Sequence, residues 1–425
     1  MHIAVLGGGI VGVTSAWYLR AAGHHVTLIE RQPGVALETS FANGSQVSAG
    51  HAEPWAQPGV WRKVLRWLPQ EDAPLLFRLR LDAAQWRWGL QFLRECAPQR
   101  FAYNLRQILA LGVYSRQSLR ALRAELGLDY DQAALGILNL YETRADFARA
   151  VAVSALVRDF GYERVALTPD EVIAREPVLR HRRAHLAGGT WTPPDETGDA
   201  HQFARALADA AIRAGVTLCC NTQVTGLVVR NGQLRSVQLI RDVATAPQPA
   251  DLAVDACVLA LGSHSVRLLR PLGIEVPIYP AKGYSVTLPL RDPDRMAGPS
   301  ITDESSKMVF TRLGQRLRVA GTAEFGGYGL ELNPVRCAAL VARARLLFPG
   351  AADDTAPVFW TGLRPATPSN RPLIGATRVA GLYLNAGHGT LGWTESCGSA
   401  RALSRLIDGL PAEVDFDLLQ HQHLR

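Results

Sequence analysis

The sequence has no apolar run long enough to span a bilayer, and its first residues do not have the pattern of a secretory signal peptide. No stretch approaches the roughly 18 consecutive apolar residues that a membrane-spanning helix needs. The apolar run at the N-terminus follows no basic segment and meets glycine at residue 7, so it is not a signal peptide. We therefore expect a cytoplasmic protein without transmembrane helices.

Cysteines are few and scattered. The six cysteines contain no CxxC motif, and no His, Cys, Asp or Glu set has the spacing of a metal site. Cys219 and Cys220 are adjacent in a strand-like run, so their side chains point to opposite faces. We expect reduced structural thiols and predict no metal.

Lysine is nearly absent, although the formal net charge is +7. The lysines are Lys63, Lys282 and Lys307, and arginine supplies the remaining positive charge. Because the basic residues are dispersed, the sequence does not indicate nucleic-acid binding. An anionic substrate or an acidic membrane surface fits this charge better.

Residues 2–30, HIAVLGGGIVGVTSAWYLRAAGHHVTLIE, carry the most information. Gly7 permits a tight turn after a strand, Gly9 lets the backbone approach a pyrophosphate, and Gly12 allows close packing of helix and strand. The first N–H groups of the helix then face the phosphates. Glu30 ends the second strand, where a carboxylate can accept hydrogen bonds from ribose hydroxyls. This pattern predicts a Rossmann-type site for the ADP half of a dinucleotide.

Two later strand-to-glycine turns favour FAD over NAD, although both dinucleotides fit the first motif. Residues 258–262 (VLALG) and 387–394 (GHGTLGWT) each run from a strand into glycine. A nicotinamide dehydrogenase needs one such turn, whereas a two-dinucleotide-fold flavoprotein brings several strand ends to one ligand. The helix after the last turn can direct N–H groups at the flavin and stabilise its reduced anion.

The rest of the chain alternates between helical and strand patterns. We expect helices over 55–130 and 200–214, and an Ala-rich helix that follows a strand at 136–142 and ends at about 160. Further β structure is expected over 188–199, 216–240 (with a turn at Asn231–Gly232), 256–261 and 277–330. The predicted fold class is α/β: a Rossmann-like two-dinucleotide FAD-binding domain with an inserted α+β substrate domain. Its expected parts are 1–54, 193–270 and 357–425 for the FAD domain, and 55–192 and 271–356 for the substrate domain.

Four longer motifs carry a family resemblance that covers residues 1 to about 406. They are ETSFANGSQVSAGHAEPWAQPG, PAKGYSVTLPL, FWTGLRPATPSNRPLIG and LNAGHGTLGWTESCGS. They closely resemble the FAD-dependent D-amino-acid dehydrogenase small subunit, within the superfamily of glycine oxidase, sarcosine oxidase and D-amino-acid oxidase. The resemblance implies noncovalent FAD, hydride transfer from the substrate Cα to flavin N5, and release of a 2-oxo acid and ammonia. It also implies electron transfer to a quinone or another acceptor other than oxygen, and association with the inner membrane.

Two departures from the wider superfamily matter. Covalent-flavin sarcosine oxidases carry cysteine where this chain has Gly362, so covalent attachment is not expected. Glycine oxidase has a second arginine in its last glycine turn, where this chain has Thr390, which argues against a narrow preference for glycine.

The residues expected to contact FAD are Gly7, Gly9, Ile10, Val11, Gly12, Glu30, Arg31, Ser40, Asn43, Gly44, Gln46, Val224, Ala260, Gly262, Gly362, Gly387, Gly389, Thr390, Leu391, Gly392, Trp393 and Thr394.

Arg364 is the expected clamp for a substrate carboxylate, because its planar fork matches a carboxylate in bidentate fashion. A plain salt bridge is the alternative. Tyr284 is predicted to add a hydroxyl to the same carboxylate, unless it is a core residue. His51 and His388 are candidates for the flavin or substrate face, against a structural role for each.

The acidic group in PPDETGD is the remaining candidate for the substrate ammonium. It comprises Asp195, Glu196 and Asp199, and a helix N-cap is the simpler role for Asp199. Hydride transfer from a neutral amine requires no protein base, so none is assigned.

A Trp-rich basic segment, 55–95, suggests contact with a membrane surface. Five of the nine tryptophans lie within it, interleaved with basic residues. They are Trp55, Trp61, Trp67, Trp86 and Trp88, among Arg62, Lys63, Arg66, Arg78, Arg80 and Arg87. The alternative is a helical lid that packs its tryptophans against the sheet.

The leading hypothesis is a flavoenzyme that oxidatively deaminates D-amino acids. One alternative is an oxidase or dehydrogenase of a cyclic secondary amine such as D-proline or D-hydroxyproline. Another is a flavin-carrying subunit that relays electrons without a substrate site of its own.

Overall fold

The first thirty residues form the β-α-β unit that the glycine motif predicts. The computed structural model describes every residue except 68–69, 243–244, 297 and 420–425, and the side chains of residues 62, 63, 65 and 66 also lie outside the described part. Strands β1 (His2–Leu6) and β2 (His25–Ile29) are parallel neighbours, and α1 (Ile10–Ala21) connects them. Gly7 takes φ +102 at the end of β1, a conformation that side chains disfavour.

This unit lies in a six-stranded sheet, parallel except for β19, which is antiparallel to β20. From edge to edge the strands are β19 (Leu373–Ala376), β20 (Leu382–Ala386), β13 (Ala256–Leu259), β1, β2 and β9 (Thr217–Cys219). The carboxyl ends of its parallel strands therefore meet along one edge, where α/β sheets bind nucleotides.

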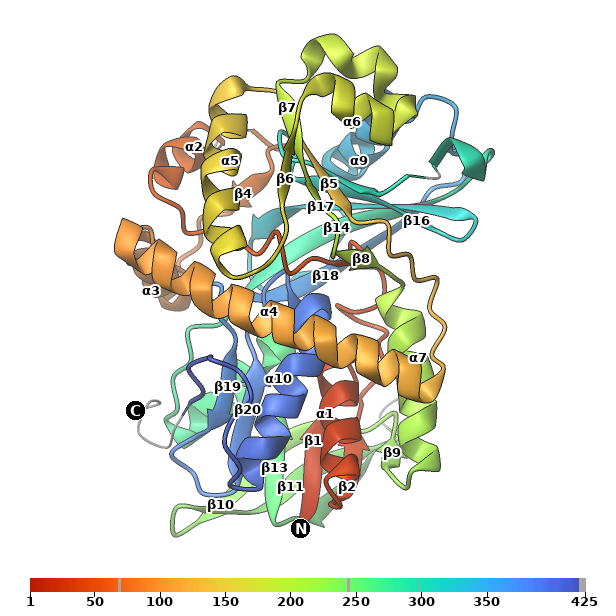
Figure 1. Ribbon diagram of the computed structural model, residues 1–425. Coiled ribbons are helices and arrows are strands. Elements are labelled where there is room, and N and C mark those ends of the chain that lie inside the picture. Colours follow the sequence, from red (N-terminus) through yellow and green to blue (C-terminus); the bar gives the residue numbers. More distant parts are fainter. Residues whose placement is uncertain (68–69, 243–244, 297, 420–425) are drawn as a thin grey trace.

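The side chains of β1 alternate between two cores, as a strand covered on both faces requires. Ile3 and Val5 pack with α1, α4, α7 and α10, whereas Ala4 and Leu6 pack with a three-stranded antiparallel meander. Figure 1 shows α1 and α10 side by side over the sheet, with the long α4 crossing them. The helices are α4 (Pro98–Leu126), α7 (Ala200–Arg213) and α10 (Gly392–Ile407), and the meander is β10 (Gln223–Arg230), β11 (Gln233–Arg241) and β12 (Gln248–Ala253).

A nine-stranded mixed sheet forms the other half of the molecule (Figure 1). Helix α9 (Pro334–Leu347) packs on one face with residues such as Leu340 and Ala344. The strand order is β18 (Val358–Ala366), β14 (Tyr279–Pro289), β17 (Arg316–Phe325), β16 (Met308–Leu313), β15 (Ser300–Asp303), β5 (Ile137–Tyr141), β7 (Gly188–Thr192) and β6 (Val165–Leu167), with β4 (Leu75–Phe77) paired to β17.

The described residues also form five further α-helices and one short pair of strands. The helices are α2 (Val60–Trp67), α3 (Ala83–Glu95), α5 (Arg144–Asp159), α6 (Pro169–Arg175) and α8 (Ser265–Leu269), and β3 (Gln46–Val47) pairs with β8 (Glu196–Thr197). Within the described residues, no helix is both long and apolar enough to cross a membrane. All six cysteines are free thiols.

The predicted hairpin is confirmed, because Asn231 (φ +53) and Gly232 (φ +72) both take the left-handed conformation that its two-residue turn requires. The all-helical prediction for 55–130 is wrong at β4, which pairs in parallel with β17. A three-residue strand has no periodicity of its own to be recognised by.

The division into two domains stays a prediction, and two elements cross its boundaries. Strand β18 lies in the range expected for the FAD domain, yet it pairs with β14 of the nine-stranded sheet. Helix α4 lies in the range expected for the substrate domain, yet Leu111 and Leu119 pack in the core against α10. Patterns along the sequence do not reveal which sheet a strand joins or which core a helix covers.

Candidate active site

A single cavity of ≈ 1050 Å³ joins the carboxyl edge of the six-stranded sheet to the inner face of the nine-stranded sheet. The residues predicted to contact FAD all line this cavity except Gly12 and Gly387, and the candidates Arg364, Tyr284, His51 and His388 line it too. The structure thus brings together residues from widely separated segments of the chain.

Glycines form the nucleotide end of the cavity. An added Cβ at Gly12 would lie 1.7 Å from the carbonyl oxygen of Gly7, so only glycine allows α1 to pack this closely on the β1 turn. At Gly9 the nearest atom to such a Cβ would be 3.5 Å away, and this backbone faces the cavity. Helix α1 has no side-chain cap at Gly9 and no acidic residue in its first turn. Its positive end is therefore suited to an anionic group.

Glu30 is fixed by the backbone at the end of β2. Its Oε2 accepts a hydrogen bond from the N–H of Gly8 at 2.6 Å, and its Oε1 accepts one from the N–H of Gln32 at 2.8 Å. Burial raises the pKa of Glu30, and these two hydrogen bonds oppose that effect. Arg31 beside it forms a bidentate pair with Glu38.

The loop after Glu30 is held in place by the nine-stranded sheet. The carbonyl of Asn43 accepts a hydrogen bond from Arg318, and the carbonyl of Gly44 accepts one from Thr311. The amide of Gln46 donates to Ser300. The residues of this loop that were predicted to contact FAD line the cavity. Their hydrogen bonds to the nine-stranded sheet connect the two halves of the molecule.

The last glycine turn leads into α10. Gly387 (φ +87) and Gly389 (φ +53) take left-handed conformations before the helix begins. His388 is 2% exposed, and burial lowers its pKa to about 3, so its imidazole is neutral. Burial raises the pKa of Glu395 in the first turn of α10, which favours its uncharged form and so weakens its opposition to the positive helix end.

Arg364 reaches the cavity from β18, and among the described residues it has no carboxylate partner. Its Nη1 donates to the carbonyl of Thr322 at 2.7 Å. Burial, followed by the nearby charge of Arg336, lowers the pKa of Arg364 to about 10, so it stays cationic at neutral pH. An added Cβ at Gly283 would lie 2.4 Å from the guanidinium carbon, so this glycine makes room for the arginine. A buried guanidinium without a carboxylate partner is suited to an anionic ligand.

Thr322 is a site residue that the sequence did not indicate. It takes φ +56, which is strained for a β-branched residue, at a register irregularity where β14 and β17 pair. This conformation directs its carbonyl to Arg364, and its own hydroxyl has no hydrogen-bond partner in the described part of the chain.

Tyr284 lines the cavity, but its hydroxyl is engaged elsewhere. The hydroxyl donates to Glu324 Oε2 at 2.6 Å, and the side chain is 1% exposed. Burial and this carboxylate raise the pKa of Tyr284. Its predicted contact with a substrate carboxylate stays a prediction.

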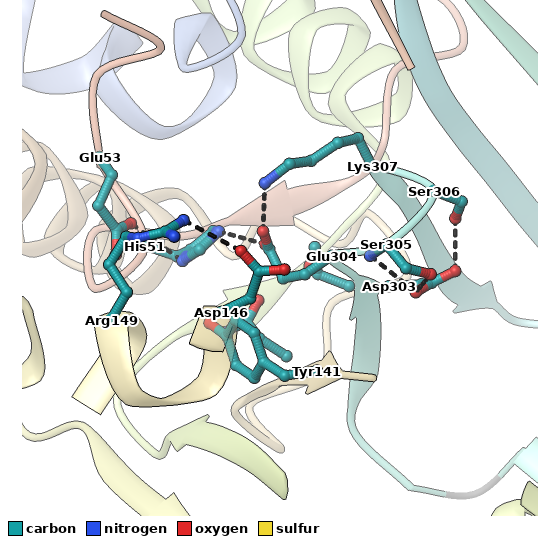
Figure 2. A network of polar contacts seen from close by, with 12 residues as sticks. His51, Glu53, Tyr141, Asp146, Arg149, Asp303, Glu304, Ser305, Ser306 and Lys307 are labelled. Atoms are coloured by element: carbon teal, nitrogen blue, oxygen red, sulfur yellow. Dashed lines mark hydrogen bonds and ion pairs between the residues drawn. The ribbon is translucent and has the colours of Figure 1, made fainter. Parts of the chain in front are cut away.

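His51 lies between two carboxylates on the polar wall of the cavity (Figure 2). Its Nδ1 is 3.0 Å from Glu53, and its Nε2 is 2.8 Å from Glu304. Burial alone would lower the pKa of His51, but the charges of Glu53 and Glu304 outweigh burial and raise it to about 9. Arg164 and Lys307 neutralise the same two carboxylates. His51 is therefore a buried cation at neutral pH and not a general base.

The acidic group in PPDETGD does not face the cavity. Asp195 accepts hydrogen bonds from Tyr162, Ser48 and the N–H of Gly50, and Glu196 pairs with two arginines. Asp199 caps α7 by accepting from two backbone N–H groups, as the simpler interpretation predicted. The expected role of this acidic group with a substrate ammonium is corrected, because these hydrogen bonds and ion pairs engage all three carboxylates away from the cavity wall.

The donor set fits FAD. The glycine cradle, the start of α1 without an acidic residue in its first turn, and the carboxylate of Glu30 suit an ADP half. The Nε2 of buried His388 has no hydrogen-bond partner among the described residues, so it remains available to a ligand. No cysteine lies among the described residues of the cavity wall, and noncovalent binding stays a prediction. Three glycine turns at one sheet edge, together with a cationic clamp, define the class of protein as a Rossmann-fold flavoprotein.

The chain belongs to the family described as "FAD dependent oxidoreductase", whose model matches residues 2–406. It is 50% identical to a D-amino acid dehydrogenase of Dechloromonas aromatica over 99% of this chain and 100% of that relative. It is 47% identical to a D-amino acid dehydrogenase of Paramagnetospirillum magneticum over 98% of this chain and 97% of that relative.

Solved structures share the fold. Glycine oxidase from Geobacillus kaustophilus superimposes with a TM-score of 0.76 at 22% identity, over 99% of this chain and 98% of that chain. L-proline dehydrogenase from P. horikoshii gives 0.72 at 19% identity, over 97% and 94%. The predicted fold class and FAD as cofactor are confirmed.

Proposed function

We propose that this protein oxidatively deaminates D-amino acids with FAD as its redox cofactor. The observation that carries the proposal is Arg364, a cation to which the described part of the chain offers no carboxylate partner, in a cavity that continues to the nucleotide end. The names of the relatives that match almost the full length of the chain support the substrate class.

The chain binds and orients the substrate in this reaction. Arg364 binds the substrate carboxylate, while the carbonyl of Thr322 and the space at Gly283 fix the orientation of its fork. FAD, when bound, would supply the acceptor for the hydride that leaves Cα. The substrate ammonium loses one proton to solvent, and water converts the imino acid into a 2-oxo acid and ammonia. No side chain is required as a base.

The residues that hold FAD are part of the proposal. Gly9 and the start of α1 bind the pyrophosphate, and Glu30 contacts the ribose. The turn 387–394 and the start of α10 would hold the flavin, and a positive helix end there would favour its reduced form.

An anaerobic titration tests the proposal. The flavin absorbance should bleach with D-amino acids and not with their L-enantiomers. Bleaching only with D-proline or D-hydroxyproline would favour a cyclic secondary amine as substrate. A protein that retains FAD but stays oxidised with every amino acid would support an electron-relay subunit and refute the proposal.

We also propose that the electrons pass to a quinone and that the protein associates peripherally with the cytoplasmic face of the inner membrane through residues 55–95. Trp61 and Trp86 in this segment are 46% and 53% exposed, whereas Trp88 is buried at 3%. Arg62, Lys63 and Arg66 have side chains outside the described part. Hydrogen peroxide released in air at the rate of substrate oxidation would refute a quinone as acceptor.

A further inference from the structure

Two residues on neighbouring strands close to Arg364 take strained backbone conformations. Lys307 has φ +54 at the end of the turn between β15 and β16, and Thr322 has φ +56 on β17. Among the described residues with positive φ other than glycine, Thr322 is the only one branched at Cβ. Side chains disfavour such conformations, which persist only where the surrounding structure enforces them. The contacts of these two residues therefore show what holds this part of the cavity wall in place.

The two strained residues lie opposite each other where the pairing of β16 and β17 ends. The last regular pair is Met308 with Gly321, and Lys307 and Thr322 are the next residues on the two strands. The N–H of Thr322 donates to the carbonyl of Lys307 at 3.4 Å. An added Cβ at Gly321 would lie 2.7 Å from that carbonyl oxygen, so glycine lets the strands come this close. Because the carbonyl of Thr322 accepts from Arg364 at 2.7 Å, a shift of the backbone at Lys307 would displace the guanidinium.

The side chain of Lys307 ends a chain of ion pairs along the polar wall of the cavity (Figure 2). Its ammonium pairs with Glu304, which lies 2.8 Å from His51 Nε2. His51 Nδ1 lies 3.0 Å from Glu53, and Glu53 pairs with Arg164 at 2.5 Å. The side chain of Arg164 is fully buried, and those of both glutamates are 10% exposed. Charges of opposite sign alternate along this chain, so Glu304 is fixed from one side and can hold the ammonium of Lys307 on the other.

A positive charge near the cavity is the alternative role for Lys307. Arg149 provides the comparison, because it also lines the cavity and pairs with a carboxylate, that of Asp146 at 3.0 Å. The side chains of Arg149 and Lys307 are exposed to a similar extent, 54% and 50%. Arg149 lies on α5, however, and not on the strands that orient the clamp. Loss of either cation should weaken an anionic ligand if charge alone matters, whereas only Lys307 should matter if the backbone does.

We propose that Lys307 is a positioning residue for the carboxylate clamp. Its ion pair with Glu304 keeps the strained backbone of Lys307 and Thr322 in place, and the carbonyl of Thr322 then fixes the orientation of Arg364. A guanidinium oriented in advance binds a carboxylate without the cost of ordering its side chain. This inference rests on the proposed function, in which Arg364 binds the substrate carboxylate.

Binding of propionate, a carboxylate without an amine, to the FAD-loaded protein tests the inference through the change in flavin absorbance. Lys307→Met removes the ion pair but keeps a side chain at a strained position, so Kd should rise about tenfold. Lys307→Gly also lacks the ion pair, yet glycine takes φ +54 without strain, so Kd should stay within about threefold of the parent. Lys307→Arg, which keeps a cation, and the control Arg149→Met should both bind propionate as the parent does.

Two further measurements separate positioning from a general loss of structure. With D-amino acids, Lys307→Met should raise KM by about tenfold and leave kcat and FAD content unchanged, because only the binding of the carboxylate is affected. Glu304→Gln breaks the same ion pair from its other side and should weaken propionate binding to the same extent. This second variant keeps the test decisive if Lys307→Met fails to retain FAD.

The outcomes that overturn the inference are distinct. Propionate binding at the parent's strength in Lys307→Met or Glu304→Gln would show that the ion pair does not position the clamp. Equal weakening in Lys307→Gly and Lys307→Met, or in Arg149→Met, would show that charge acts directly and would also overturn it. A lower kcat with unchanged KM would do the same. If the parent binds propionate in this Lys307-dependent way but no D-amino acid bleaches its flavin, the proposed function alone is refuted.

Discussion

At its nucleotide end, the cavity is bounded by backbone: the glycine turn after β1, the first N–H groups of α1 and the turn before α10. At its substrate end, it is bounded by charged side chains, with Arg364 on β18 and His51 between two carboxylates. The shape of the nucleotide end depends on glycines, which carry no side chain. The charge state of the substrate end depends on how burial and neighbouring charges shift the pKa values of its residues.

The two ends also differ in sequence range. Gly7 and Gly12 contact each other within one turn and one helix start. Arg364 and Thr322 lie 42 residues apart, and His51 meets Glu304 across the interface of two segments. The nucleotide end is therefore formed by residues close together in the sequence, whereas the substrate end depends on strand register across the larger sheet.

Gly12→Val should have the largest effect. Its side chain would overlap the carbonyl of Gly7, where an added Cβ already lies at 1.7 Å, so α1 must move off β1. We expect loss of FAD binding and destabilisation by more than about 3 kcal/mol, measured by flavin content and thermal unfolding. Gly89→Ala in α3 is the control, since its Cβ meets nothing within 4 Å. If Gly12→Val retained FAD and its stability, the nucleotide end would not depend on the close backbone packing that glycine allows.

Arg364→Met should leave FAD content unchanged and lower kcat/KM for D-amino acids by about 10²–10⁴, because the substrate carboxylate would lose its charged partner. Arg364→Lys keeps the charge but loses the fork, so it should recover only part of the activity. Stopped-flow flavin reduction measures both variants. If Arg364→Met bound substrate as the parent does, the carboxylate clamp would lie elsewhere.

The nucleotide end was predictable from the sequence because each of its devices is local. Gly7 and Gly12 lie within one continuous motif. Two features outside the nucleotide end were predictable for the same reason, namely the hairpin turn at Asn231–Gly232 and the N-cap at Asp199. Arg364 was also predicted, from its motif and from the chemistry of guanidinium.

The partners at the substrate end could not be predicted. Thr322 is strained because β14 and β17 pair with an irregular register. No pattern in the sequence predicts that irregularity. The hydroxyl of Tyr284 meets Glu324 instead of a ligand, for the same reason of cross-strand register. His51 was a candidate, but its cationic state depends on Glu53 and on the distant Glu304.

His51→Gln should change how stability depends on pH. The folded pKa of His51, about 9, lies above its unfolded value of about 6.5, so its charge stabilises the fold fully below pH 6.5. That contribution, on the order of 3 kcal/mol at most, is lost as pH rises through 9. The parent should therefore be more stable than the variant at pH 6, and the gap should close by pH 10. Denaturant unfolding at both pH values measures it, and a gap independent of pH would show that His51 is not a buried cation.

Gly283→Ala should give the smallest effect, and it separates the two ends most cleanly. Its methyl group would lie 2.4 Å from the guanidinium carbon of Arg364, so the flexible arginine must shift while the nucleotide end stays untouched. We expect KM for D-amino acids to rise about tenfold, equal to about 1.4 kcal/mol, with unchanged FAD content and unfolding temperature. Unaltered KM would mean that the fork tolerates displacement. Loss of FAD would mean that the two ends are coupled through β14. The nucleotide end would then not be independent of the long-range contacts that form the substrate end.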